Sequence, residues 1–409
     1  MTYLPLLFMI GLLLLIVTLG SGWIARLPLS YALIYLIAGV ILGSHGVGWI
    51  SLRPNAEFIE RLTEMVVIIS VFGCGLKMQR PLRLGLWQST IRLIGLVMPL
   101  SILAIALVGH GLLNLDWGSA IILGAVLSPT DPVLASEVQL DHPDDDDDLR
   151  FGLTSEGGLN DALAFPFVYF GIYWFTKGSF DSWGKNWILI DVLWAIAAGL
   201  VMGVAVAWSI IWLERQLQRR PPVNDLMMQL TALSTVFLTY TLTEFVNGYG
   251  FLAVFVAGVV IRKCYRCDRS KRFAQAAFIE QLEKLLEVAT IVLLGSLLQF
   301  EAIRSNIGPA LILAIAILFV IRPIVTWISL IGSTLPRRVR LMMGWFGIRG
   351  VGSIYYLTYA LGEGFTGEQA NQIGWMTYTV ITLSIILHGV SATPLMQWYE
   401  HHPGEKRKK

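Results

Sequence analysis

Charged residues are scarce in this chain of 409 residues, where Asp, Glu, Lys and Arg together make up only 14%. A soluble globular domain is usually nearer a quarter charged, so the composition excludes a water-soluble enzyme and a nucleic-acid-binding protein. Three cysteines cannot form a disulfide framework, and no connecting loop is long enough for an independent soluble core. What the sequence has instead is 55% apolar residues, together with 14 Trp and 13 Tyr that suit two membrane–water interfaces.

Long apolar runs recur along the whole chain. A hydrocarbon core of roughly 30 Å needs about 20 apolar residues per helix, and we identify about thirteen candidate spans. They lie near residues 4–20, 29–43, 63–76, 89–113, 117–139, 151–175, 187–213, 226–246, 251–261, 285–300, 309–331, 341–361 and 373–395. The sequence therefore predicts an all-α polytopic membrane protein.

Basic residues lie mainly in the loops on one side of this topology. The opposite loops carry only Arg53, Arg61, Lys177, Lys185 and Arg304. Because cytoplasmic loops are enriched in Lys and Arg, we expect the N-terminus outside and the C-terminus in the cytoplasm, with a short basic tail over 398–409. The expected location is the plasma membrane, as a bacterial inner-membrane protein.

Span five contains an acidic residue between two prolines, in the run Leu127-Ser-Pro-Thr-Asp-Pro132. Each proline removes a backbone donor and clashes with the preceding turn, so we expect the helix to break and Asp131 to accept from the freed amides. Interrupted helices at membrane depth line cavities and build the ion sites of secondary transporters. A proline kink with Asp131 as a plain cap is the alternative interpretation.

Span six carries the run Thr154-Ser-Glu-Gly-Gly-Leu-Asn-Asp161, which is polar in an otherwise apolar segment. A hard cation such as Na⁺ needs several oxygens and at least one negative charge, and Asp161, Ser155 and Thr130 could supply them. A carboxylate that binds either a cation or a proton is a physical basis for exchange. The alternative is a polar cluster that only holds helices together.

Two arginines lie at bilayer depth, where an unpaired charge is expensive. Arg322 in span eleven needs an anion, and we expect a structural ion pair with Glu156. Arg349 lies in the glycine-rich run 347–352 of span twelve, so we expect a second interruption there. Arg349 could neutralise the carbonyl end of a broken helix. The two interruptions are seven spans apart, which reverses their direction and fits an inverted repeat with two crossing broken helices.

Four motifs in order resemble the NhaP/NHE branch of monovalent cation:proton antiporters. They are Ser128-Pro-Thr-Asp-Pro-Val, Ser155-Glu-Gly-Gly-Leu-Asn-Asp, Gly347-Ile-Arg-Gly and His388-Gly-Val-Ser-Ala-Thr-Pro. The resemblance implies an NhaA-like antiporter fold of thirteen helices, with Asp161 as the carrier of cation and proton and Asn160 as its neighbour. It also places Thr130, Asp131 and Arg349 at the crossing and pairs Glu156 with Arg322. In one departure, the family's span-three acid is absent from the stretch 72–76.

The resemblance further implies a homodimer that works by an elevator-like movement. The dimer scaffold would comprise about 1–86 and 185–300, and the mobile core about 87–180 and 305–397, within one transmembrane domain over 1–400. With one titrating carboxylate, the resemblance implies electroneutral exchange of one Na⁺ or Li⁺ for one H⁺, in the service of pH homeostasis. No cofactor and no enzymatic activity are expected.

Other functions stay open at this point. K⁺/H⁺ exchange could use the same machinery, and a channel or ion sensor without coupled transport is a second class. Among lesser features, the acidic run Asp144–Asp148 could concentrate cations or could be a solvated loop. His110 and His388 could sense pH or simply pack, and Glu64 and Glu244 could line entrances or only form hydrogen bonds.

Overall fold

The computed structural model describes residues 11, 12, 15, 30–44, 46–48, 56–140, 145–217, 225–265, 269–299, 301, 304 and 307–402. Every regular element within these residues is a helix, and the predicted all-α class is confirmed. Most of the predicted first span, together with Arg53, Asp144 and the basic tail from 403 onward, lies outside the described residues.

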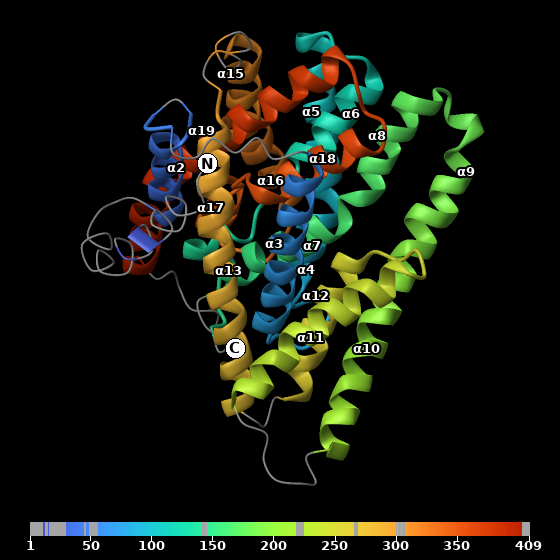
Figure 1. The fold of residues 1–409 in the computed structure, drawn as a ribbon, viewed down its shortest axis with the longest axis vertical. Coiled ribbons are helices and arrows are strands. Elements are labelled where there is room, and N and C mark those ends of the chain that lie inside the picture. Colours follow the sequence, from blue (N-terminus) through green and yellow to red (C-terminus); the bar gives the residue numbers. More distant parts are fainter. Residues whose placement is uncertain are drawn as a thin grey trace.

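The helices follow the predicted spans closely at most positions. In chain order they are α2 (Tyr31–Leu42), α3 (Ala56–Lys77), α4 (Gln88–Arg92), η1 (Leu93–Val97), α5 (Met98–Leu113), α6 (Trp117–Leu127), η2 (Ser136–Val138), α7 (Asp148–Leu163), α8 (Phe165–Lys177), η3 (Phe180–Ser182), α9 (Gly184–Asn186), η4 (Trp187–Trp194), α10 (Ala195–Leu217), α11 (Asp225–Glu244), α12 (Gly250–Cys264), α13 (Arg269–Leu297), α15 (Ile307–Ile315), η5 (Ala316–Ile321), α16 (Arg322–Ser329), α17 (Arg337–Trp345), α18 (Val351–Gly362) and α19 (Glu368–His401). Figure 1 shows the long helices running mostly along one axis of the molecule.

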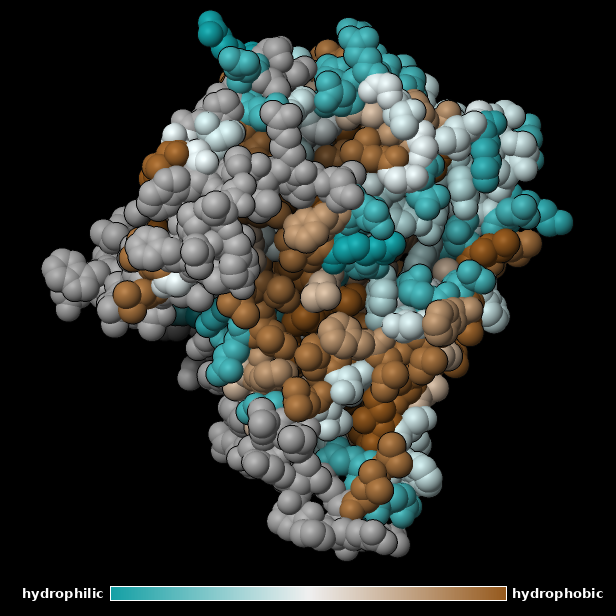
Figure 2. Space-filling model, in the orientation of Figure 1, coloured by the Kyte–Doolittle hydropathy of each residue, from teal (hydrophilic) through white to brown (hydrophobic). Residues whose placement is uncertain are grey.

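In the part of the chain that the structure describes, four continuous helices are long and apolar enough to cross a membrane. They are Gln88–Leu113, Gly184–Leu217, Ile307–Ser329 and Glu368–His401, and Tyr31–Leu42 and Trp117–Leu127 are shorter apolar helices. Large apolar side chains are exposed along α10, among them Trp208 and Trp212. Figure 2 shows apolar residues over the middle and lower right of this face, where α10 lies in Figure 1. Such an apolar exterior suits a lipid environment.

Three of the segments that differ from their predicted bounds do so for a clear physical reason. Span five is helical only to Leu127, and beyond the break it forms turns and the short 3₁₀ segment η2. Span six is two helices, because Pro166 in the first turn of α8 cannot donate to the preceding turn. Span ten is longer than predicted, since α13 begins at Arg269 in a charged stretch that carries no apolar signal.

Glycines allow the helices around the site to pack closely. Gly75 of α3 faces Gly258 of α12, and a Cβ built on Gly258 would lie 3.0 Å from the Cα of Gly75. Gly39 of α2 faces Gly295 of α13 in the same way, again at 3.0 Å. Small residues at such contacts let helix backbones approach within a membrane. These contacts place α3 and α12 directly beside α7, which carries the polar run of span six.

Candidate functional site

The polar run of span six lies on α7, which begins at the capping side chain of Asp147. Its Oδ1 accepts from the amides of Leu149 and Arg150 at 2.9 and 3.0 Å, which satisfies two of the free donors at the helix start. Further along, a Cβ on Gly158 would lie 2.8 Å from the Cβ of Cys74 and from the ring of Phe255. Gly158 therefore lets α7 press against α3 and α12.

Asp131 holds together the two interrupted helices. Its Oδ1 accepts from the amides of Val133 and Leu134 at 2.8 and 3.0 Å, just beyond the end of α6. Its Oδ2 accepts from the amides of Val351 and Gly352 at the start of α18. One buried carboxylate thus accepts from amides in both segments, after α6 and at the start of α18, and offsets the positive end of a helix.

Arg349 makes the complementary contacts at the carbonyl end of α6. Its Nη1 donates to the backbone oxygens of Ser128 and Pro129, the latter at 2.7 Å, and the side chain is completely buried. The amide of Asp131 also donates to the oxygen of Ile348 at 2.8 Å. The break after α6 therefore meets the break between α17 and α18. The carboxylate of Asp131 binds the free amides, and the guanidinium of Arg349 binds the free carbonyls at the end of α6.

Asp161 lies next to this meeting point and is fully buried. A Cβ on Gly352, in the first turn of α18, would lie 2.6 Å from its Oδ1. Neither of its carboxylate oxygens has a hydrogen-bond partner within the described residues. An uncompensated buried carboxylate is strongly unfavourable, so this group is the candidate binding group for a cation or a proton.

The neighbour of Asp161 links α7 to the break of α6. Asn160 donates from Nδ2 to Thr130 Oγ1 at 2.8 Å, while its amide oxygen has no partner among the described residues. The Asn160 amide oxygen and both Asp161 carboxylate oxygens, on successive residues of α7, are thus unused among the described residues. Ser155 is engaged elsewhere, since its hydroxyl lies 2.6 Å from Thr90 Oγ1 and donates to the oxygen of Gly152. Its role as a cation ligand stays a prediction.

Glu156 and Arg322 form a bidentate ion pair between α7 and α16. The Nη2 of Arg322 donates to Glu156 Oε2 at 2.7 Å and to the oxygen of Met343 at 3.0 Å, and Nη1 donates to Glu156 Oε1. Both residues are buried. Arg322 follows the π-helical segment η5, and Pro323 lies directly after it. The pair fixes α7 against α16 without using the Asp161 carboxylate.

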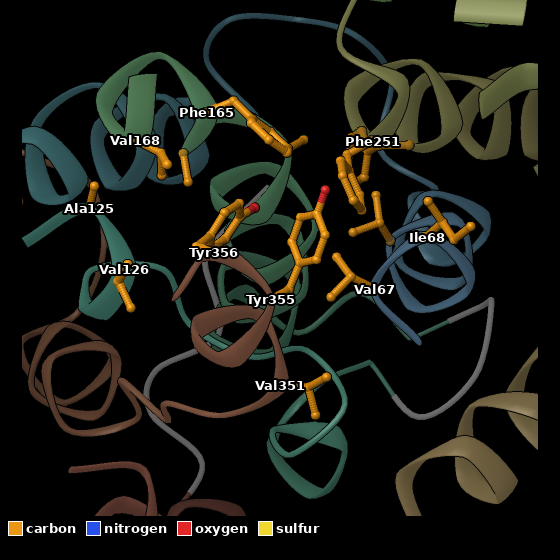
Figure 3. Close-up of a cluster of buried hydrophobic side chains, with 14 of the residues drawn as sticks. Val67, Ile68, Ala125, Val126, Phe165, Val168, Phe251, Val351, Tyr355 and Tyr356 are labelled. Carbon is orange, nitrogen blue, oxygen red and sulfur yellow. The ribbon is translucent and has the colours of Figure 1, made fainter. Parts of the chain in front are cut away.

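An aromatic cluster, defined here as Phe165, Tyr355, Tyr356 and Phe251, is linked to Asp161 through Tyr356. The ring centroid of Phe165 lies 5.9 Å from that of Tyr355, 5.4 Å from that of Tyr356 and 5.5 Å from that of Phe251. Figure 3 shows these rings turned toward one another from α8, α18 and α12. The hydroxyl of Tyr356 donates to the backbone oxygen of Asp161.

The acidic loop before α7 is bound by basic side chains over its described part, 145–148. Arg80 donates to Asp146 Oδ1 at 2.8 Å and pairs with Asp148 at 2.9 Å, with its guanidinium 4.2 Å from the ring centroid of Phe151. Arg150 contacts Asp145 at 3.6 Å. These residues therefore anchor the loop between the end of α3 and the start of α7.

The remaining polar candidates take part in structural contacts. Glu244 accepts from the amide of Gly250 at 2.9 Å, and Glu64 accepts from Tyr240 and Arg61. His110 lies 2.7 Å from the oxygen of Leu115, and His388 bridges Ser384 and the oxygen of Trp345. No group of three or more His, Cys, Asp or Glu side chains that could hold a metal ion occurs in the described part of the chain.

Sequence analysis missed a set of carboxylates on α13, namely Glu280, Glu283 and Glu287. They line a cavity with the segment that follows the break of α6. Their spacing of three and four residues places them on one helix face. This spacing is visible in the sequence. It was missed because the helix was predicted to begin near residue 285, in the apolar half of α13.

These features define a membrane protein that is all-helical over its described residues and is built around two interrupted helices and one uncompensated buried carboxylate. Residues 11–398 match the model of the family described as sodium/hydrogen exchanger, transmembrane, and the chain belongs to this family. The family predicted from the motifs is therefore confirmed.

Among similar proteins, the K(+)/H(+) antiporter NhaP of Alkalimonas amylolytica is 24% identical over 396 residues, covering 95% of this chain and 66% of the relative. The K(+)/H(+) antiporter NhaP2 of Shewanella baltica is 22% identical over 390 residues, covering 94% and 65%. This chain thus spans slightly less than two thirds of the length of these relatives.

The fold is also similar to a solved structure. The sodium proton antiporter MjNhaP1 of Methanocaldococcus jannaschii superposes with a TM-score of 0.72 at 21% identity, over 96% of this chain and 99% of that one. A second structure of the same antiporter gives a TM-score of 0.76 at 20% identity over both complete chains. This agreement supports the antiporter fold for the whole chain.

Proposed function

We propose that this protein is a secondary active transporter that exchanges a monovalent cation, Na⁺ or Li⁺, for a proton across the membrane. The observation that carries the proposal is the buried Asp161 carboxylate, which has no hydrogen-bond partner in the described chain and lies against the first turn of α18. Such a group is stable with a cation or with a proton, and each excludes the other. Competition for one carboxylate couples the two flows.

The ligands we propose for the cation are the Asp161 carboxylate and nearby neutral oxygens. Asn160 and Thr130 are in contact with each other beside it, and Ser155 is a further candidate if its bond to Thr90 opens. Asp131 and Arg349 hold the two interruptions in place, because their charges are already matched by backbone groups. They keep the site rigid while Asp161 changes its occupant.

Alternating access would come from an elevator-like movement of a core, about 87–180 and 305–397, against a scaffold, about 1–86 and 185–300. In this proposal the aromatic cluster is the barrier on the Lys177 side, supported by the contact of Tyr356 with the backbone of Asp161. The cavity beside α13 would be the entrance, since Lys77 at the end of α3 lines it. This arrangement supports an inward-facing state if the basic loops are cytoplasmic. A homodimer in the bacterial inner membrane, with the N-terminus outside, completes this proposal.

K⁺/H⁺ exchange is the second candidate, because the two NhaP relatives described above carry that name. Purified protein in proteoliposomes with an internal pH-sensitive dye distinguishes the candidates. We expect an outward gradient of Na⁺ or Li⁺ to drive proton uptake, with a smaller response to K⁺. A larger response to K⁺ would establish the second candidate, and no cation-driven proton movement would refute both.

A further inference from the structure

A cavity of about 220 Å³ lies between α13 and the segment that follows the break of α6. Glu283 and Glu287 line it from α13, and Pro132 and Gln139 line it from the broken segment. Lys77, the last residue of α3, also lines the cavity, which places it on the side of the basic loops. A space of this size can hold a hydrated monovalent cation.

Two polar side chains in the cavity wall are buried and lack partners. Glu287 is only 7% exposed and forms no hydrogen bond or ion pair among the described residues. Gln139 is 3% exposed, and its Nε2 has no partner there. Because a buried carboxylate without a partner is unfavourable, Glu287 needs water or a cation from the cavity.

The charges around the cavity leave an excess of negative charge. On the rim, Lys284 and Glu280 form an ion pair at 2.8 Å and offset each other. In all, the lining holds the four carboxylates of Glu137, Glu280, Glu283 and Glu287 and the two positive charges of Lys77 and Lys284. A cleft lined by one sign of charge raises the local concentration of the opposite ion.

The far wall of the cavity is in contact with the helix that carries Asp161. A Cβ on Gly157 would lie 3.1 Å from the Cβ of Pro132 and 3.3 Å from Gln139 Nε2. Gly157 precedes Asp161 by one helical turn and shares its face. The segment that lines the cavity is therefore in contact with α7 one helical turn before Asp161.

We propose that this cavity is a second cation site, in which Glu287 holds a hydrated monovalent cation between the cytoplasm and Asp161. The inference rests on the proposed function for its direction of transport, but the site itself depends only on the cavity and its carboxylates. The described part of the chain has no cluster of three ligands for direct coordination. This fits a cation that is held by one carboxylate and water.

The first test compares exchange by Glu287→Gln with exchange by the wild type in proteoliposomes. We expect the variant to raise the KM for Na⁺ roughly tenfold, at the low end of charge focusing in a cleft, while the maximal rate stays close to that of the wild type. Glu287→Asp, which keeps the carboxylate, should have a KM for Na⁺ close to the wild-type value. Glu57→Gln, an exposed matched change at the other end of α3, should leave the KM unchanged.

The second test measures binding of ²²Na⁺ to protein with Asp161→Asn, in which the transport site is disabled. We expect residual binding that the additional Glu287→Gln abolishes. Binding that persists in the double variant, or a KM that Glu287→Gln does not change in an exchanging protein, would overturn the cavity site and leave the proposed function standing. If the wild type shows no exchange, the proposed function fails, and the binding test alone decides on the cavity.

Discussion

At the scale of single residues, the charges buried in this protein divide into matched and unmatched ones. Asp131 accepts from four backbone amides, Arg349 donates to two carbonyls, and Glu156 is paired with Arg322. Asp161 alone among these acids has no such partner in the described chain. Matched charges hold the structure, and the unmatched one can change its state during transport.

Removing one member of the buried ion pair should destabilise the protein strongly. Arg322→Met leaves Glu156 buried without its partner, which typically costs about 3–5 kcal/mol. We expect a lower Tm for the variant in detergent, measured by thermal unfolding. Replacing both residues, with Glu156→Leu added, should recover much of the loss. A wild-type Tm for Arg322→Met alone would show that the pair does not stabilise the fold.

A methyl group beside Asp161 should impair exchange without loss of fold. Gly352→Ala would place a Cβ 2.6 Å from Asp161 Oδ1, inside contact distance, so the carboxylate must move from its position at the start of α18. We expect a large loss of exchange rate at an unchanged elution volume on size-exclusion chromatography. Gly374→Ala is the control, because no atom lies within 4 Å of its built Cβ. Equal rates for the two variants would contradict the proposed position of the site.

At the scale of helices, hydropathy predicts the elements well where a helix is apolar throughout. The predicted span 89–113 corresponds to the continuous helix Gln88–Leu113, and 309–331 to Ile307–Ser329. The method fails for α13, whose charged first half gives no apolar signal, and at Pro166, where one predicted span is two helices. Hydropathy measures composition and cannot register helices that extend beyond the lipid.

In the candidate site, local sequence patterns predict some features, whereas others depend on contacts between segments far apart in the chain. Proline, glycine and charge patterns predict the two interruptions and their residues Asp131 and Arg349. The contact of Asn160 with Thr130, and of Ser155 with Thr90, depends on how α7 packs against distant segments. Neither contact follows from spacing along the chain, so sequence reasoning grouped Ser155 with Thr130 on composition alone.

Close helix packing should make the α2–α13 contact sensitive to side-chain size. Gly295→Val would place its Cβ 3.0 Å from the Cα of Gly39, a backbone atom that cannot move without separating the helices. We expect a lower Tm and weaker exchange. Gly111→Val on α5 is the matched control, since its built Cβ has no neighbour within 4 Å. A Tm for Gly295→Val equal to that of the control would contradict the packing.

At the scale of the whole molecule, one exchangeable carboxylate predicts exchange that moves no net charge. A cation and a proton would each cross on Asp161 in the same charge state, whereas Asp131 and Arg349 keep their charges throughout. We expect that a membrane voltage imposed with K⁺ and valinomycin leaves the rate of Na⁺/H⁺ exchange unchanged. A rate that rises or falls steeply with voltage would require a second exchangeable charge.

The most direct test of the central claim replaces the carboxylate of Asp161 by the amide of similar shape. Asp161→Asn should keep the Tm and elution volume of the wild type but abolish cation-driven proton movement in proteoliposomes, for Na⁺, Li⁺ and K⁺ alike. If this folded variant still exchanged any of these cations for protons at the wild-type rate, Asp161 could not be the group that binds them in turn.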